Sequence, residues 1–311
     1  MNAVRKRVKK RGGLSWRENA ELYTMLAPTV ILIFIFCYIP MYGLIIAFQD
    51  YVPGRQFLSL VNANWVGFEH FTAFINSIFF SRLIWNTIRL SLLNLLFGFT
   101  IPILFALLLN EVKNLHFKKF VQTVSYLPYF ISTVVVAGLV LSFLEPNGLV
   151  NNILAMFGVQ PTEWIVQPKA YPTIYTVTNV WKNFGFSSVL YFSTMASIDP
   201  TLYESAKIDG ANRWKQMLYI TLPGLRNIIA ITLILQLGAL LTSNTELALL
   251  LYRSATYETS DVIGTFVYRM GIEQGKYSYS TAVGLFLSII GFGLTFVANK
   301  VSNKFAGYGL W

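Results

Sequence analysis

Residues 83–109 read LIWNTIRLSLLNLLFGFTIPILFALLL. A transmembrane helix needs about 20 mostly apolar residues to cross roughly 30 Å of hydrocarbon. This stretch is long enough and holds one charged residue, Arg89. Its apolar residues run continuously, whereas a membrane β-strand would alternate apolar and polar positions over a short segment. The stretch therefore predicts a membrane-spanning helix.

The composition of the whole chain supports a membrane protein. Of its 311 residues, 55% are hydrophobic and only 12% are charged, against roughly 25% charged residues in soluble domains. The mean hydropathy is +0.54. Such a chain is unlike a soluble globular enzyme or a disordered protein, and with Cys37 as its one cysteine it is not a disulfide scaffold.

Five further apolar runs resemble the first, which gives six predicted spans. They cover residues 23–48, 83–109, 120–144, 171–196, 225–251 and 281–299. Proline and glycine inside a span are tolerated because neighbouring helices satisfy the freed backbone groups. We therefore expect an all-α polytopic membrane protein with six transmembrane helices.

Basic residues are distributed unevenly over the connections between these spans. Most lie in the N-terminal tail, in the connections after spans two and four, and after span six, for example Arg5, Lys6, Arg7, Lys118, Lys119, Lys207, Arg213, Lys215, Lys300 and Lys304. By the positive-inside rule both termini are expected in the cytoplasm of a plasma membrane, most simply a bacterial one. The basic tail then faces anionic lipid headgroups rather than nucleic acid.

The connection between the fourth and fifth spans has a marked pattern. Residues 199–224 read DPTLYESAKIDGANRWKQMLYITLPG. Asp-Pro is a helix-start signal, so a first helix should run to about Ile208. Gly210 permits a tight reversal, and a second helix should run from about Ala211 to Ile220, where Leu-Pro-Gly stops it. Trp214, Met217 and Tyr219 should lie on an exposed face. The residues alone leave two readings open, a docking surface or an ordinary interfacial loop.

This segment resembles the EAA signature of ABC importer permeases. The match covers Glu204-Ser205-Ala206, Asp209-Gly210-Ala211 and Ile220-x-Leu222-Pro223, with Ser205 in place of the central alanine and Met217 where phenylalanine is common. Other segments resemble the polysaccharide or complex-oligosaccharide (Lpl-type) branch of carbohydrate permeases, namely residues 46–51, 65–68, 198–200, 261–269, 277–286 and 308–311.

The resemblance implies a type I importer permease with the MetI-like fold and no cofactor of its own. It implies a second homologous permease subunit, two ATPase subunits that bind ATP and Mg, and an extracellular solute-binding lipoprotein as partners. The chain has no G-x-x-x-x-G-K-[ST] phosphate loop of its own. The residues implied in coupling to the ATPase are Glu204, Ser205, Ala206, Asp209, Gly210, Ala211, Trp214, Leu222 and Pro223.

Polar residues inside the fourth and fifth predicted spans are candidates for the sugar path. Sugars are bound by amide, carboxylate and aromatic groups, and the candidates are Tyr175, Asn179, Lys182, Asn183, Phe186, Gln236, Ser243, Asn244 and Glu246, with the aromatic Trp181 and Phe184 nearby. The first five form one helical stripe. The competing interpretation is interhelical hydrogen bonding. Lys182 could pair with Glu246 or face an acidic sugar.

Three other interpretations compete with the sugar permease. A permease for a cargo other than sugar stays open, and an integral-membrane enzyme would need a motif such as H-E-x-x-H or G-x-S-x-G, neither of which occurs. A channel or secondary transporter would show repeated halves.

Three smaller predictions complete the sequence analysis. His70 and His116 fall on opposite sides of the membrane and predict no metal site. Asp261 is a plausible N-cap for a short outer helix. The expected division is a tail (1–22), a first helix with an outer segment (23–81), a transport domain (82–299) and a second tail (300–311).

Overall fold

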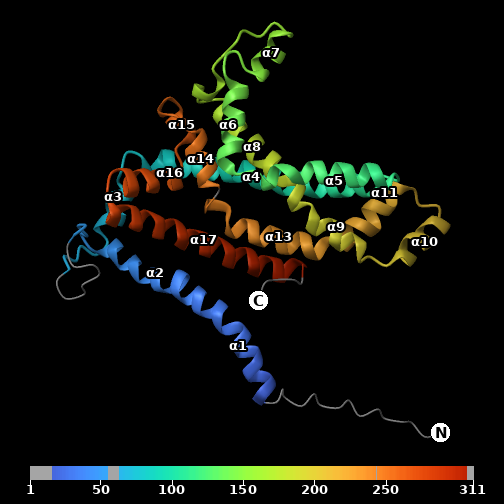
Figure 1. Cartoon of the computed structure of the whole chain (residues 1–311), viewed down its shortest axis with the longest axis horizontal. Helices are drawn as coiled ribbons and strands as arrows, with labels where there is room; N and C mark the ends of the chain where they lie inside the picture. Colours follow the sequence, from blue (N-terminus) through green and yellow to red (C-terminus); the bar gives the residue numbers. More distant parts are fainter. Residues whose placement is uncertain (1–15, 55–62, 243, 307–311) are drawn as a thin grey trace.

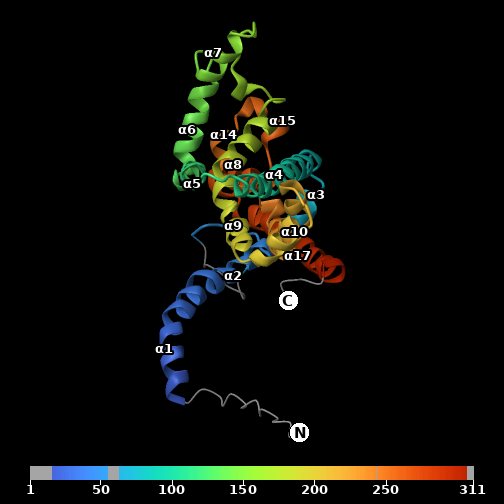
Figure 2. The same cartoon turned by 90° about the vertical axis from the view of Figure 1, so that its right-hand side faces the viewer.

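A computed structural model describes residues 16–54, 63–242 and 244–306, and this part of the chain is almost entirely helical (Figures 1 and 2). The α-helices are α1 (Trp16–Ile33), α2 (Ile39–Met41), α3 (Glu69–Ile75), α4 (Phe80–Asn110), α5 (Leu115–Phe130), α6 (Thr133–Leu144), α7 (Leu149–Ala155), α8 (Tyr171–Ser187), α9 (Val189–Ala196), α10 (Pro200–Ile208), α11 (Arg213–Gln216), α12 (Leu222–Gly224), α13 (Arg226–Gly238), α14 (Thr245–Leu251), α15 (Tyr257–Ser260), α16 (Ile263–Tyr268) and α17 (Tyr277–Ala306). Short π-helical or 3₁₀ turns join several of them. The one β-bridge described pairs Gln49 with Trp65.

Four helical stretches are long and apolar enough to span a membrane within these residues. They are Asn19–Phe48, Phe80–Asn110, Thr133–Ala155 and Tyr277–Lys304, and the bent pair Arg213–Gly224 and Arg226–Gly238 would make a fifth. The all-α, multi-spanning architecture is therefore confirmed. A count of six spans stays a prediction, because the third, fourth and fifth predicted spans are each interrupted.

The third predicted span is not one helix, and the prediction of a continuous helix over 120–144 is wrong. Helix α5 ends at Phe130 and α6 begins at Thr133, with Ile131 extended between them (φ −77°, ψ 136°). Pro128 in the last turn of α5 lacks an N–H, and Ser132 caps α6 by accepting from the backbone of Val135. The break is stabilised from α8, since Lys182 Nζ donates to the carbonyls of Tyr129 and Ile131 at 3.2 and 2.8 Å.

The fourth and fifth predicted spans are also broken. Residues 171–196 form α8 and α9, which are separated by a turn at Ser188. Residues 225–251 form α13 and α14 with a 3₁₀ turn at Leu240–Thr242 between them. The Asn244 side chain caps α14 by accepting from the Leu247 N–H at 3.2 Å. Non-helical backbone at membrane depth is stable only where other protein groups satisfy it, and at the α13–α14 break the Asn244 side chain does so.

Helix α8 is the central element of the bundle, because it packs against both α4 and α5. Its contact with α5 is so close that a Cβ placed on Gly185 would overlap the backbone carbonyl of Ser125. Glycine is therefore required at this position for the helices to pack. On the other side of the bundle α13 packs along α17. Helix α1 diverges from this body and leaves most of its apolar side chains exposed (Figure 1).

A buried ion cluster connects α4 to α15 and α16 at the α3 end of the molecule, which lies opposite α10 in Figure 1. Asp261 is 0% exposed and accepts from Arg269 at 2.6 and 3.0 Å, while Arg82 approaches it to 3.5 Å. The expected N-cap role of Asp261 is wrong, because α16 is preceded by Val262 and the carboxylate points to the arginines instead. Asn86 on α4 also donates to the Asp261 carbonyl, at 3.1 Å.

Candidate functional site

The segment 199–224 forms the predicted bracket of two helices joined by a tight turn. Asp199 caps α10 by accepting from the Thr201 N–H at 2.9 Å, and this hydrogen bond holds the pKa of the Asp199 carboxyl below its ordinary value. Helix α10 ends at Ile208, as expected. Gly210 follows with φ +76°, a left-handed conformation that favours glycine. Asn212 then caps α11 by accepting from Lys215 N at 2.9 Å.

The second arm of the bracket differs from the expectation at its end. Leu222-Pro223-Gly224 does not stop the helix, which continues through a π-turn at Met217–Thr221 into α12. Pro223 lacks an N–H and lies directly after the π-turn, where the regular i→i−4 hydrogen-bond ladder is already interrupted. The chain then bends by 59° into α13. Met217 is 7% exposed rather than on the outer face, because the π-turn directs it into a core that includes Tyr191 and Leu225.

The bracket is attached to the bundle and presents an uncovered outer face. Arg213 Nη1 donates to the Glu111 carbonyl at the end of α4, at 3.0 Å, and Tyr203 Oη lies 2.9 Å from Thr221 Oγ1. Trp214 is 63% exposed. The other sequence-predicted positions are largely uncovered too: Glu204, Ser205, Asp209, Gly210 and Pro223 are exposed, and Ala206, Ala211 and Leu222 are half-buried. The bracket therefore offers an apolar and charged surface at one end of the molecule.

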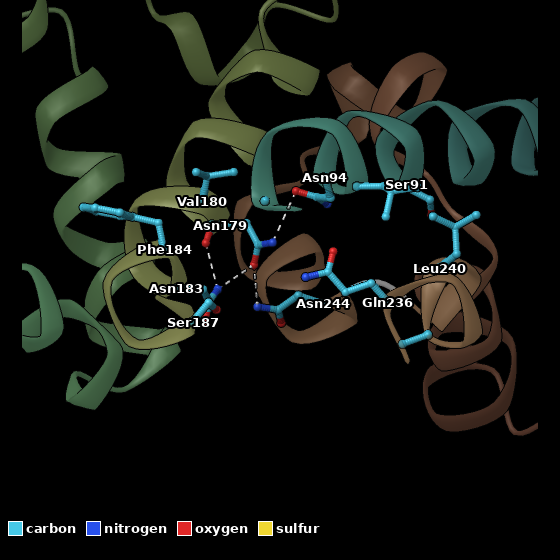
Figure 3. Close-up of a pocket in the computed structure, with 13 residues that line it drawn as sticks. Ser91, Asn94, Asn179, Val180, Asn183, Phe184, Ser187, Gln236, Leu240 and Asn244 are labelled. Carbon is cyan, nitrogen blue, oxygen red and sulfur yellow. Dashed lines mark hydrogen bonds between the residues drawn. The ribbon is translucent and has the colours of Figure 1, made fainter. Parts of the chain in front are cut away.

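A polar cavity of about 210 Å³ lies between α4, α8 and the break between α13 and α14 (Figure 3). Its polar lining consists of Ser91, Asn94, Asn179, Asn183, Ser187, Gln236 and Asn244. None of the described residues that line it is charged. The structure thus brings together four of the sequence-predicted path residues from two different spans.

The amides of the cavity form a connected network centred on Asn179. Its Nδ2 donates to Asn94 Oδ1, and its Oδ1 accepts from both Asn183 Nδ2 and Asn244 Nδ2, each at 3.2 Å (Figure 3). Asn183 Nδ2 also donates to the Asn179 carbonyl at 2.7 Å. Amides both donate and accept, so the network can exchange some of these bonds for bonds to hydroxyl groups. It is therefore chemically suited to a hydroxyl-rich ligand.

Two cavity residues on α4 were not predicted from the sequence, Ser91 and Asn94. Ser91 Oγ and Asn94 Nδ2 are buried and have no hydrogen-bond partner among the described residues. Leaving such a group unsatisfied costs about 1–3 kcal/mol, so water or a ligand is expected to complete them. The available signal was their spacing of three residues, which places both side chains on one face of the helix.

Other members of the predicted stripe on α8 lie outside this cavity. Lys182 is 8% exposed and caps the break between α5 and α6, with its Nζ 5.8 Å from the centre of the Tyr129 ring. Phe186 stacks on Tyr129 with ring centres 4.0 Å apart. Tyr175 Oη donates to the Asn244 carbonyl at 3.3 Å, which supports the cavity from behind. The stripe on α8 therefore faces the amide cavity with Asn179 and Asn183, and the α5–α6 break with Lys182 and Phe186.

The acidic candidate of the fifth span is also separate from the cavity. Glu246 is exposed in the first turn of α14, and no ion pair is found between it and Lys182 within the described residues. In this structure the Lys182 ammonium donates to two carbonyls instead, and a Lys182–Glu246 pair stays a prediction. Ser243 lies outside the described residues. Of the two nearby aromatics, Phe184 lines the amide cavity, whereas Trp181 lines an apolar groove between α4 and α8.

Comparison with known proteins gives consistent results along the whole chain. Residues 98–306 match the family described as binding-protein-dependent transport system inner membrane component. The polygalacturonan/rhamnogalacturonan transport system permease protein YteP of Bacillus subtilis is 39% identical, over 99% of this chain and 95% of its own length. Protein LplB of the same organism is 38% identical over 96% and 95%. A crystal structure of a bacterial alginate ABC transporter, in complex with an alginate pentasaccharide-bound periplasmic protein, contains a similar chain. That chain is 43% identical with a TM-score of 0.86, over 94% of this chain and 98% of that one.

Proposed function

We propose that the amide cavity forms half of the translocation path for an oligosaccharide, because the chain belongs to the family of binding-protein-dependent transport system inner membrane components. The chain is a permease subunit of a carbohydrate importer, not an enzyme. The single observation that supports the proposal is the uncharged amide network around Asn179. Beside it, Ser91 Oγ and Asn94 Nδ2 line the same cavity without a hydrogen-bond partner among the described residues.

The cavity is small for a complete binding site. Pockets for small ligands usually measure about 300–1,000 Å³, whereas this one measures about 210 Å³. A second, homologous permease subunit would supply the opposite wall. Two homologous but different halves facing one another would enclose a sugar chain that neither half encloses alone. We therefore infer a pair of permease subunits as the transporting unit.

We infer an acidic oligosaccharide as the cargo. Two of the similar proteins are named for polygalacturonan/rhamnogalacturonan and for alginate. Amide N–H groups donate to carboxylates as readily as to hydroxyls, so an uncharged cavity accepts a uronate without binding it too tightly to release it. Lys182 does not line this cavity, and its ammonium donates to the Tyr129 and Ile131 carbonyls of the α5–α6 break.

The bracket is proposed to couple transport to ATP hydrolysis. In this proposal α10 and α11 face the cytoplasm, both termini lie on the same side, and Trp214 and its exposed neighbours dock on one of two ATPase subunits that bind ATP and Mg. The α3 end then faces outward, where a solute-binding lipoprotein delivers the cargo. Residues 82–299 would form the transport domain, with 23–81 adding the first helix and an outer segment.

The function is tested with the assembled transporter, comprising both permease subunits and the ATPases, in lipid nanodiscs. The probe is the binding protein loaded with oligogalacturonate or alginate oligosaccharide, and maltooligosaccharide is the neutral comparison. We expect ATP hydrolysis to rise with the acidic oligosaccharides. Stimulation by the neutral sugar alone would overturn the acidic assignment, and the absence of stimulation by any sugar would overturn the sugar path.

A further inference from the structure

A second cavity, of about 590 Å³, lies at the α3 end of the molecule, outside both the bracket and the amide network. Its wall is formed by the segment after Phe48, by α3, and by the start of α17. Polar and aromatic side chains share this wall, including Asp50, Tyr51, His70, Lys276, Tyr277 and Tyr279. Its volume falls within the range of about 300–1,000 Å³ that is common for small-molecule sites.

The wall of this outer cavity is held in place by contacts between distant segments. The Tyr51 N–H donates to Ser278 Oγ at 3.0 Å, which connects the segment after Phe48 to α17. His70 Nε2 lies 3.2 Å from the Gln49 carbonyl, which connects α3 to the same segment. Just before α17, Gly275 adopts φ +68° and turns the chain into the wall. The cavity is therefore built by the fold rather than left between loose ends.

The aromatic rings of the wall stand at steep angles to one another. Tyr51 and Tyr277 meet edge to face with ring centres 6.3 Å apart, and His70 and Tyr279 do so at 6.5 Å. In such pairs one ring keeps a face free for another group. Asp50 and Lys276 are exposed beside them and supply one acceptor and one donor of opposite charge. Ring faces bind the apolar C–H face of a sugar, and the charged groups bind its hydroxyls or a carboxylate.

The segments that meet here lie outside the two sites described so far, because neither belongs to the bracket or lines the amide cavity. The fold brings Asp50 and Tyr51 to the start of α17 at one cavity. The charged and aromatic groups of this cavity are therefore not used by either of those sites.

We propose that this outer cavity is a second saccharide subsite, which binds one unit of an acidic oligosaccharide separately from the amide cavity. Tyr277 provides the stacking face, Asp50 accepts from hydroxyls, and Lys276 pairs with a uronate carboxylate. The inference rests on the proposed function, because it takes the cargo to be an acidic oligosaccharide. It adds a site on the outward side of the path, where incoming cargo would first meet the permease.

The test uses the assembled transporter in nanodiscs without the binding protein, and oligogalacturonate as the probe. Saturation-transfer NMR measures contact of the sugar with the protein. Four forms are compared: the wild type, Asn179→Leu, Tyr277→Ala and the double variant. Tyr277→Phe keeps the ring, and Tyr268→Ala is a matched control, because Tyr268 is exposed on α16 but does not line the cavity.

We expect sugar contact to persist at a reduced level in Asn179→Leu. In the double variant, which adds Tyr277→Ala to that background, binding should weaken further by about two- to tenfold, the loss of one aromatic face contact. Tyr277→Phe and Tyr268→Ala should leave it unchanged. If Tyr277→Ala has no effect in either background, the outer subsite is overturned, whereas loss in Tyr277→Ala with no effect of Asn179→Leu would overturn the amide path instead.

A separate measurement distinguishes a sugar subsite from a docking surface for the binding protein. Sugar-free binding protein is titrated against the wild type and Tyr277→Ala, and its association with the transporter is measured. Equal association supports the saccharide subsite. A loss of association with unchanged saturation transfer would overturn it and assign the cavity to protein docking.

Discussion

Asn244 Nδ2 donates to Asn179 Oδ1 at 3.2 Å and so joins the start of α14 to the middle of α8. The two residues come from different predicted spans and meet only because the fifth span is broken between α13 and α14. The same Asn244 side chain also caps α14 through the Leu247 N–H. One amide therefore both ends the break and closes the polar cavity, so that a movement of α14 relative to α8 must change the cavity.

Replacing Asn179 by leucine should impair transport without unfolding the subunit. The change removes the centre of the amide network, while water in the cavity can satisfy Asn94 and Asn244. With one to two hydrogen bonds lost at about 1 kcal/mol each, stimulation of ATP hydrolysis by sugar-loaded binding protein should need about tenfold more of it. Asn152→Leu is the control, because Asn152 is exposed on α7. Equal behaviour of the two variants would contradict the role of the cavity.

Replacing Lys182 by methionine separates two roles of this residue. If Lys182 stabilises the α5–α6 break, the variant leaves the Tyr129 and Ile131 carbonyls without a charged donor, and a hydrogen bond to a charged group contributes about 1.5–3 kcal/mol. Thermal melting of the purified transporter should then shift downward, and transport of every cargo should fall alike. Selective loss of acidic oligosaccharides, with unchanged melting, would instead assign Lys182 to the cargo.

The bracket could be predicted because its signals are local. Asp199-Pro200 marks the helix start and Gly210 the reversal, and both act through backbone geometry within a few residues. The prediction that Leu222-Pro223-Gly224 stops the helix failed because a helix can also accept proline beside a π-turn, where the i→i−4 hydrogen-bond ladder is already interrupted. A local signal with two structural outcomes cannot be resolved without the packing around it.

Local residues such as Pro128 and Ser132 do not by themselves predict the breaks inside the spans, because continuous spans also tolerate proline and serine. The groups that satisfy the freed carbonyls are far away in the sequence. The carbonyls at the α5–α6 break are satisfied by Lys182, 51 and 53 residues further along the chain. Four of the cavity amides, Asn179, Asn183, Gln236 and Asn244, were found because polar groups inside spans are costly. Ser91 and Asn94 were missed because the same span also carries Asn86, Thr87 and Arg89, and the sequence does not show which of these polar residues face a cavity.

Replacing Gly210 by valine should abolish coupling while the subunit still inserts. Its φ of +76° costs an L-residue about 1–2 kcal/mol and more for a β-branched one, so the turn of the bracket should rearrange. Gly158 has φ +79°, and like Gly210 it has open space around its Cβ position. Gly158→Val is therefore a control with the same strain at the other end of the molecule. Sugar uptake should be lost in the first variant and retained in the second.

Replacing Asp261 by asparagine should destabilise the α3 end of the transporter. The carboxylate is fully buried and pairs with Arg269, whose side chain is 14% exposed. Breaking a buried pair from one side costs about 3–5 kcal/mol, and the lower end is expected here because Arg82 is partly solvated. The melting temperature of the purified complex reports the loss. Glu258→Gln, at a nearby exposed carboxylate, should melt as the wild type does, and a wild-type melting curve for Asp261→Asn would contradict the structural role.

Replacing Arg213 by methionine tests how the bracket acts on the bundle. Arg213 Nη1 donates to the Glu111 carbonyl, where α4 ends, and α4 carries Ser91 and Asn94 in the cavity. A movement of the bracket can therefore reach the cavity along α4, and also along the bend from α12 into α13. Removing the first connection should leave assembly and basal ATP hydrolysis intact but reduce stimulation by sugar-loaded binding protein severalfold. Lys113→Met is the control, since Lys113 is an exposed basic residue just after the end of α4 and lies outside the bracket. If both variants couple normally, transmission runs through the α12–α13 bend alone.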